Sequence, residues 1–286
     1  MELDRRNMLR AWAIGVGLSA LSGVVAAQPV APPASPRPQP LPPDPRVGQR
    51  TYRFGPTGED LPYAVFVSSK VRKDKPAPLI IALHGLNGNH NTLMRGALLD
   101  LAEKGGYVVV APMGYNPRGW YGIPGEYSPR AGLGRTPDPA AAHDPPNLRA
   151  LSEQDVMNVL ALAKQEFRTD PARTFLVGHS MGGAGALYLA SKYPKQWNAV
   201  AAIAPATRRM VPRMQEVLSK ITVPVMITQG VVDQAVPVDM TRTWIDAMEE
   251  RKMIFRYEEI QDADHRTVID RSMLGVFAFL ERPDKP

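Results

Sequence analysis

The chain has 286 residues, of which 44% are hydrophobic and 22% are charged, and this composition excludes disordered, collagenous and disulfide-scaffold proteins. The formal net charge is +6. Because the charges are scattered and form no block of one sign, we expect no nucleic-acid partner. The sequence contains no Cys, which excludes disulfides, thiolate metal sites and a cysteine nucleophile.

Residues 1–27 have the organisation of an export signal. The pair Arg5 and Arg6 precedes an apolar run that ends in small residues at 25–27, as a signal peptidase prefers at its cleavage site. Glycines within the run and prolines after it make a permanent membrane span the weaker interpretation. The segment around the arginine pair resembles the twin-arginine signal. We therefore expect the export machinery to carry a folded protein to the periplasm or the medium.

The next segment, 28–46, contains nine of the 29 prolines of the chain. Each proline fixes φ and removes an amide donor, so this stretch is expected to form an extended linker. The remaining residues, 47–286, are long enough for one catalytic domain, with a loop insertion at 113–147 that is rich in Gly and Pro.

Short apolar runs alternate with amphipathic stretches along this domain, a pattern typical of the α/β class. We predict a mostly parallel, twisted sheet of about eight strands with helices on both faces. The expected strands are 51–54, 61–67, 79–83, 107–111, 173–177, 199–203, 223–228 and 254–259, of which the first two form an antiparallel pair. The expected helices run from an N-cap at Ser152 towards Phe167, and over 181–192, 239–251 and 267–280.

The sequence Gly178-His179-Ser180-Met181-Gly182 places a Gly-x-Ser-x-Gly motif between a predicted strand and a predicted helix. A serine at such a sharp turn takes strained backbone angles, and only small residues fit two positions away on either side. The positive end of the following helix favours the charge that develops in acyl transfer. Ser180 is therefore the predicted nucleophile. A purely structural glycine-rich turn is the alternative.

A serine nucleophile needs a histidine base held by a carboxylate. Among the five histidines, only His265 comes after the last predicted strand. The acid is expected after the strand 223–228, where Asp233 is the candidate, because Asp239 belongs to the next helix. An ordinary surface position is the alternative for both residues.

Two backbone amides should face the carbonyl oxygen as it becomes an oxyanion. One is expected from Met181, directly after the nucleophile, and the other from the turn that follows the strand 79–83. In that turn, Leu86 is the preferred donor and Asn87 the alternative, while a plain β-turn is also compatible with the sequence. Since His84, Asn87 and His179 lie within the two turns, we expect their side chains to bind substrate.

The ordered set of His84-Gly85, the serine motif with Gly183 after it, Asp233 and His265 resembles the α/β-hydrolases over about residues 50–282. Within that superfamily it is similar to a secreted esterase branch with polyhydroxybutyrate depolymerases, feruloyl esterases and prolyl-oligopeptidase-like peptidases. The resemblance implies the α/β-hydrolase fold and a serine hydrolase that cleaves carboxylic esters. The absence of Cys and of a polymer-binding module departs from several of these families.

The insertion at 113–147 follows a predicted strand at the edge where such sheets bind ligands. It contains Trp120, Tyr121, Tyr127 and Arg130. We expect Trp120 and Tyr121 to line the acyl or alcohol pocket. A surface insertion without a role in binding is the alternative.

The predicted reaction passes through an acyl-enzyme formed by the triad of Ser180, His265 and Asp233. No metal or organic cofactor is expected, because the sequence lacks a P-loop, a dinucleotide-binding turn and a His-Glu-x-x-His motif. The substrate is expected to be a small or oligomeric ester. A serine peptidase or amidase, an acyltransferase and a non-catalytic binding module remain alternatives, and the sequence leaves the oligomeric state open.

Overall fold

The computed structural model describes residues 42–125 and 139–283. The predicted export signal at 1–27, most of the proline-rich segment 28–46, and the middle of the 113–147 insertion with Tyr127 and Arg130 lie outside the described residues. In the ranges that the structure describes, no helix combines the length and the apolar character needed to span a membrane.

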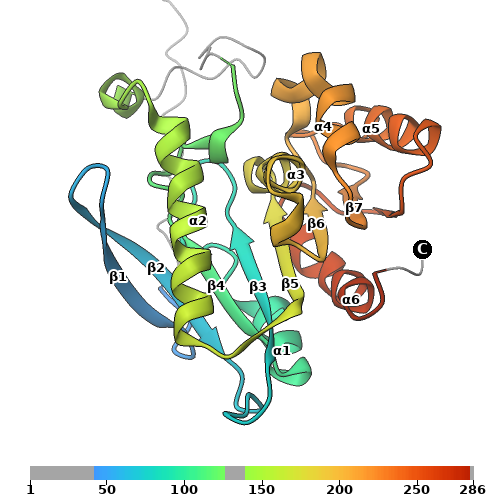
Figure 1. The fold of residues 1–286 in the computed structure, drawn as a ribbon. Coiled ribbons are helices and arrows are strands. Elements are labelled where there is room, and N and C mark those ends of the chain that lie inside the picture. The colour runs from blue at the N-terminus through green and yellow to red at the C-terminus, as the bar shows by residue number, and fades with distance from the viewer. Residues whose placement is uncertain (1–41, 126–138, 284–286) are drawn as a thin grey trace, which may run out of the picture. The chain divides into compact units, whose positions relative to one another are not determined.

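The described chain forms an eight-stranded sheet with the order β1-β2-β4-β3-β5-β6-β7-β8 (Figure 1). The strands are β1 (Gly48–Phe54), β2 (Glu59–Val67), β3 (Ala77–Leu83), β4 (Val108–Pro112), β5 (Thr169–His179), β6 (Ala199–Ile203), β7 (Val225–Gly230) and β8 (Phe255–Ile260). The strand β2 pairs antiparallel with both β1 and β4, and every other pairing is parallel. The predicted α/β fold class with a mostly parallel sheet is confirmed.

The middle of the sheet is apolar on both faces because helices cover both. All residues of β3, β4 and β6 are buried, whereas β1 and β8, at the two edges, expose polar side chains. Continuous apolar runs are typical of parallel strands that are covered on two sides.

The helices are α1 (Gly96–Gly105), α2 (Leu148–Glu166), α3 (Met181–Lys192), α4 (Met214–Lys220), α5 (Val238–Glu250) and α6 (Thr267–Glu281). Four short 3₁₀ segments accompany them: η1 (Trp120–Gly122), η2 (Pro139–His143), η3 (Pro194–Gln196) and η4 (Thr207–Arg213). One apolar cluster joins α2, α3, α4 and α5 to one face of the sheet, and a second joins α1 and α6 to the other. Figure 1 shows α2 crossing in front of the sheet and α6 behind it.

The start of α2 differs from the prediction. The helix begins at Leu148, after Asn147 at the N-cap position, so Ser152 lies inside the helix and is not its N-cap. Leu148 and Leu151 are buried, and their burial extends the helix by one turn towards its N-terminus. The hydroxyl of Ser152 instead accepts a hydrogen bond from the Tyr121 amide at 3.1 Å.

The six strands β3, β4, β5, β6, β7 and β8 run parallel, so they all end at one edge of the sheet. We call this the carboxyl edge and the opposite one the amino edge. Loops that follow these strands carry His84, Ser180, Asp233 and His265. The topology thus brings distant parts of the chain to the place where open parallel sheets bind ligands.

Candidate active site

Ser180 lies in the turn between β5 and α3 with φ 58° and ψ −117°, angles that a non-glycine residue adopts only where its surroundings enforce them. A Cβ atom on Gly178 would overlap the carbonyl of Gly182, and one on Gly182 would overlap the carbonyl of Leu83. The two glycines of the motif therefore allow β5, α3 and β3 to approach closely enough to form this turn.

Main-chain hydrogen bonds hold the turn on the side of β6. The amide of Ser180 donates to the carbonyl of Ile203 at 2.9 Å. The carbonyl of Ser180 accepts from the amides of Ala184 at 3.0 Å and Ala206 at 2.9 Å. With its main chain bonded in this way, the serine keeps its strained conformation, and only its side chain remains free to bond elsewhere.

The side chains of Ser180, His265 and Asp233 form a continuous chain of hydrogen bonds. Nε2 of His265 lies 2.9 Å from Oγ of Ser180, and Nδ1 of His265 lies 2.7 Å from Oδ2 of Asp233. When Nδ1–H donates to the carboxylate, Nε2 is free to accept the serine proton. The structure brings together the three residues that the sequence analysis selected.

Asp233 is buried at the end of β7 and accepts several hydrogen bonds. Its Oδ1 accepts from the amides of Ala235 at 2.8 Å and Val236 at 2.9 Å. Burial on its own raises the pKa of Asp233, but the hydrogen bonds from His265 and from these amides outweigh it and hold the pKa below its usual value. The carboxyl group is therefore charged and fixed in orientation.

Gln229, a fully buried residue of β7, also orients Asp233. Its Nε2 donates to Oδ2 of Asp233 at 3.1 Å and to the carbonyl of Val236 at 2.9 Å, while its Oε1 accepts from Thr241 at 2.8 Å. The sequence analysis missed this residue. A glutamine inside an otherwise apolar strand is the signal that could have revealed it, because buried polar groups need partners.

The turn after β3 lies against the serine. A Cβ atom on Gly85 would be 3.2 Å from Cβ of Ser180. The amide of Asn87 donates to the carbonyl of Pro117 at 2.9 Å, whereas the amide of Leu86 bonds to no described residue. Met181 is the first residue of α3, where an amide has no partner within the helix. Leu86 and Met181 thus each carry a main-chain amide, next to the turn of Ser180, that has no partner among the described residues.

His84 is buried and its ring is already occupied. The two ring nitrogens lie 2.8 Å from the carbonyl oxygen of Gly85 and 2.7 Å from that of Met113. Burial lowers the pKa of His84, although both carbonyls act in the opposite direction. Because both ring nitrogens face main-chain carbonyl oxygens, neither faces the substrate as the sequence led us to expect.

Trp120 and Tyr121 follow β4 with φ 56° and 50°. Tyr121 is fully buried and its hydroxyl donates to the carbonyl of His84 at 3.0 Å. It therefore stabilises the turn after β3 and does not line an open pocket. Trp120 is also buried, and its ring lies 4.3 Å from the guanidinium carbon of Arg209.

Asp155 of α2 fixes the first part of the same loop. It accepts from the amide of Tyr115 at 2.9 Å and from the hydroxyl of Tyr52 at 2.6 Å. Burial raises the pKa of Asp155, against the effect of these donors. This role of Asp155 was not predicted from the sequence.

His179 is 6% exposed, and its Nε2 lies 2.7 Å from the carbonyl oxygen of His265. It was expected to bind substrate, but both its burial and its partner point it towards the main chain of the histidine loop. Residues 42–125 and 139–283 contain no group of three or more His, Cys, Asp or Glu side chains that could hold a metal ion.

A sheet of this order with a strained serine at the end of β5 and an acid and a histidine after later strands defines an α/β-hydrolase. The Esterase family model matches residues 57–271, and the chain belongs to that family. This membership confirms the superfamily and the esterase branch predicted from the sequence.

Curated relatives include S-formylglutathione hydrolases. That of Rattus norvegicus is 34% identical over 146 residues, which cover 50% of this chain and 51% of the relative. That of Paracoccus denitrificans is 29% identical over 152 residues, covering 52% of this chain and 53% of the relative. The chain thus spans about half the length of the curated relatives that it matches.

Solved structures share the fold at low identity. An S-formylglutathione hydrolase from Agrobacterium tumefaciens is 20% identical with a TM-score of 0.64, over 83% of this chain and 95% of the other. A ferulic acid esterase from Anaeromyces mucronatus is 17% identical with a TM-score of 0.64, over 83% and 90%. These similarities establish the architecture.

Proposed function

We propose that the chain is an exported serine hydrolase that cleaves carboxylic esters through an acyl-enzyme. The observation that carries this proposal is the hydrogen-bonded series from Ser180 through His265 to Asp233. Membership of the Esterase family supports the reaction class, and the relatives support a serine esterase of the S-formylglutathione hydrolase or feruloyl esterase type.

In the first half of the reaction, Oγ of Ser180 attacks the ester carbonyl while its proton passes to Nε2 of His265. The carbonyl oxygen becomes an oxyanion, to which the amides of Met181 and Leu86 donate. When the tetrahedral intermediate collapses, the bond to the alcohol breaks and His265 gives the proton to the leaving oxygen. While His265 carries the proton, the carboxylate of Asp233 stabilises its imidazolium form.

In the second half, water attacks the acyl-enzyme and His265 accepts one of its protons. Collapse of the second intermediate releases the carboxylic acid and returns the proton to Ser180. His265, oriented by Asp233, therefore acts as the base and then as the acid in each half of the reaction.

Three exposed apolar side chains lie on connections that follow strands ending at the carboxyl edge. Leu86, Val211 and Val232 are 41%, 49% and 52% exposed and follow β3, β6 and β7. Because these strands end at the edge that carries Ser180, we infer that the three side chains contact the substrate. They favour an ester with an apolar acyl or alcohol part.

Thioester hydrolysis is the second candidate, favoured by the curated relatives, which are S-formylglutathione hydrolases. The purified chain should be assayed on nitrophenyl esters of increasing acyl length, feruloyl esters, S-formylglutathione and peptide amides, with and without added alcohol. Hydrolysis of esters that Ser180→Ala abolishes and Ser219→Ala, on an exposed serine of α4, retains would support the proposal. A chain that cleaves only amides, or that transfers acyl groups to alcohol in preference to water, would contradict it.

Export rests on the sequence of residues 1–27. We expect the full chain to be found in the periplasm or medium when it is expressed in a bacterium that has the general secretory and the twin-arginine export pathways. The double substitution of Arg5 and Arg6 by Lys should retain it in the cytoplasm if the twin-arginine pathway is used, while Arg10→Lys should not. Unchanged export of the double variant would contradict that pathway.

A further inference from the structure

The imidazole of His179 is a buried ionisable group for which the proposed reaction has no use. It is the last residue of β5 and directly precedes Ser180. Three parts of the candidate site meet at its ring. Its Nε2 is 2.7 Å from the carbonyl oxygen of His265, its ring centroid is 4.6 Å from that of His265, and a Cβ atom on Gly85 would lie 3.3 Å from its Nδ1.

The ring is uncharged at neutral pH. Burial and, to a lesser extent, the neighbouring His265 lower the pKa of His179 to about 4. A neutral imidazole has one N–H, and a carbonyl oxygen can only accept. The short distance to the His265 carbonyl therefore requires the hydrogen to be on Nε2, so that His179 donates to the main chain of His265.

That main chain belongs to the turn between β8 and α6. The carboxylate of Asp264 accepts from the amides of Arg266 at 2.9 Å and Thr267 at 2.8 Å, which orders the residues after His265. The carbonyl of His265 itself is bonded to His179. Since the side chain of His265 is 23% exposed, packing alone does not fix its position. The hydrogen bond from His179 to the His265 carbonyl therefore helps to hold this residue in place.

We propose that His179 is a positioning residue whose Nε2–H···O=C bond holds the main chain of His265, so that the His265 ring faces Oγ of Ser180. This inference rests on the proposed function, because it concerns the base of that reaction. A shift of about 1 Å between base and nucleophile is enough to slow a reaction about a hundredfold, and a hydrogen bond to the backbone of the base is a direct means of preventing such a shift.

Two substitutions separate the hydrogen bond from packing. Glutamine carries an N–H about as far from its backbone as Nε2 of histidine, whereas leucine fills similar space without a donor. We expect His179→Leu to lower kcat on a nitrophenyl ester about 10- to 100-fold, with KM changed less than about threefold. His179→Gln should recover kcat to within about fivefold of the wild type. The rate at which a fluorophosphonate labels Ser180 should follow the same order.

The control is Tyr107→Phe, which removes a hydrogen bond to Glu281 at the amino edge and should leave kcat and labelling unchanged. If His179→Leu fails to fold, His179→Asn, whose shorter amide falls short of the carbonyl, takes its place beside His179→Gln. Wild-type kcat in the donor-free variant would overturn the inference, as would a glutamine variant as slow as the leucine variant. A wild-type chain that hydrolyses no ester would overturn the proposed function as well, whereas an active wild type with an equally active His179→Leu would overturn the positioning role alone.

Discussion

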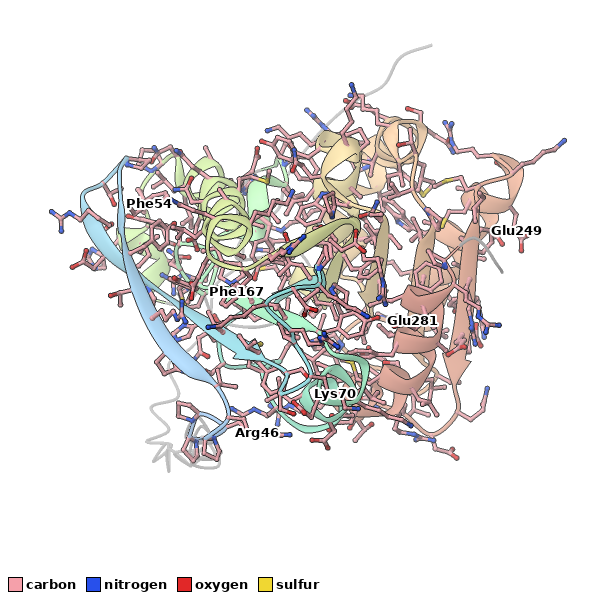
Figure 2. All side chains as sticks on the ribbon, turned by 60° about the horizontal axis from the view of Figure 1, so that its bottom comes forward. Arg46, Phe54, Lys70, Phe167, Glu249 and Glu281 are labelled. Atoms are coloured by element: carbon pink, nitrogen blue, oxygen red, sulfur yellow. The ribbon has the colours of Figure 1, made fainter. Side chains whose placement is uncertain are left out.

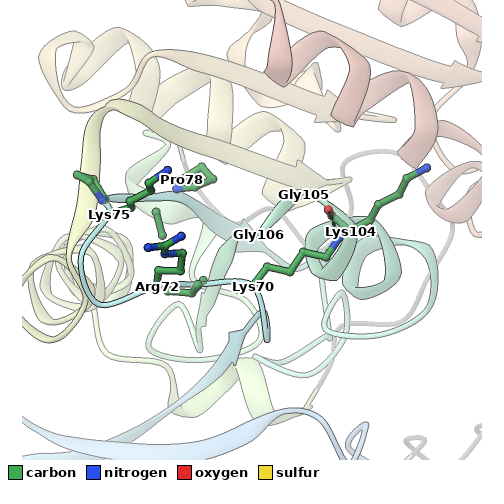
Figure 3. A pocket seen from close by; sticks show the side chains of 10 residues that line it. Lys70, Arg72, Lys75, Pro78, Lys104, Gly105 and Gly106 are labelled. Carbon is green, nitrogen blue, oxygen red and sulfur yellow. Dashed lines mark hydrogen bonds between the residues drawn. The ribbon is translucent and has the colours of Figure 1, made fainter.

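Polar side chains are buried at one edge of the sheet and exposed to water at the other. At the carboxyl edge, Asp233, His179 and His84 are buried and each has specific hydrogen-bond partners. At the amino edge, charged groups surround an open hollow of about 230 Å³ and remain in water (Figure 3). Polar groups that are withdrawn from water and mutually oriented can do chemistry, whereas solvated ones mainly keep the protein soluble.

The hollow at the amino edge lies between the β2–β3 connection and the end of α1, and its charged lining residues are Lys70, Arg72, Lys75 and Lys104. Arg72 pairs with Asp74, with both side chains more than 60% exposed, and Lys70 donates to the carbonyl of Lys104 at 2.9 Å. Figure 2, in which the bottom of Figure 1 comes forward, labels Lys70 and Glu281 at this edge. Exposed pairs of this kind contribute little to stability.

Backbone strain is also concentrated at the carboxyl edge. Eight described residues other than glycine have positive φ, and seven of them follow a strand that ends at this edge: Asn87, Tyr115, Trp120, Tyr121, Ser180, Ala204 and Asp262. The eighth, Lys252, lies between α5 and β8. Each such residue costs about 1–3 kcal/mol and persists only where its surroundings enforce it. The strain and the buried hydrogen bonds coincide in space, which distinguishes this edge as the functional one.

The largest effect is expected from Asp233→Asn. Since an amide can donate to Nδ1 of His265 and so stabilise the wrong tautomer, we expect kcat to fall about 10³- to 10⁴-fold with the fold intact. Asp239→Asn, on the exposed first turn of α5, is the matched control and should keep full activity. Ester hydrolysis kinetics and circular dichroism of both variants test this, and an Asp233→Asn variant within about tenfold of wild type would contradict the role of the carboxylate.

The second effect concerns acid stability. His179 has its pKa lowered to about 4 by burial and by His265, with Asp233 acting in the opposite direction. Because the folded protein holds the neutral ring, the stabilisation is complete above about pH 6.5 and is lost as the pH falls towards 4, a decrease of about 3 kcal/mol. Denaturant titrations between these pH values measure it. The free energy of unfolding should decrease less steeply with falling pH in His179→Gln than in the wild type. An equal decrease in both proteins would exclude His179 as its source.

A smaller effect is expected from Tyr121→Phe, which removes only the hydroxyl that donates to the carbonyl of His84. The buried carbonyl loses a partner, so we expect a loss of about 1–2 kcal/mol in unfolding free energy. Because this carbonyl belongs to the turn that presents Leu86, kcat should fall about tenfold. Tyr115→Phe, whose hydroxyl bonds the exposed Glu59, is the control. Equal kcat values for the two variants would show that the turn does not depend on Tyr121.

The smallest effect belongs to the amino edge. Arg72→Ala breaks an exposed ion pair with Asp74, and we expect a change of less than about 0.5 kcal/mol in stability and kcat within the error of the assay. A loss of activity of tenfold or more would show that the two edges are coupled and would remove the contrast between them.

The fold was predictable because its signals are local and repeated. The apolar runs at 79–83 and 199–203 could be recognised as buried strands, and the serine motif between a strand and a helix fixed the direction of the sheet. The order of the acid and the histidine then followed from the topology. In contrast, α1 and α4 were not predicted, and they are short, with 10 and 7 residues.

The supporting residues of the site could not be predicted in the same way. Asp155 acts through Tyr115, 40 positions away in the sequence. Gln229 bonds nearby residues, and only its place inside an apolar strand marks it as buried. Tyr121 was expected to line a pocket because its loop follows a strand at the edge where such sheets bind ligands, but its side chain is fully buried and bonds the carbonyl of His84. Such roles depend on tertiary packing, which one sequence does not reveal.

The central claim is that His265 activates Ser180 as a nucleophile, and the rate of covalent labelling by a fluorophosphonate measures this directly. We predict a single modification on Ser180 in the wild type, none in Ser180→Ala, and labelling at least about a hundredfold slower in His265→Ala. Modification of another residue, or an unchanged rate in His265→Ala, would contradict the claim.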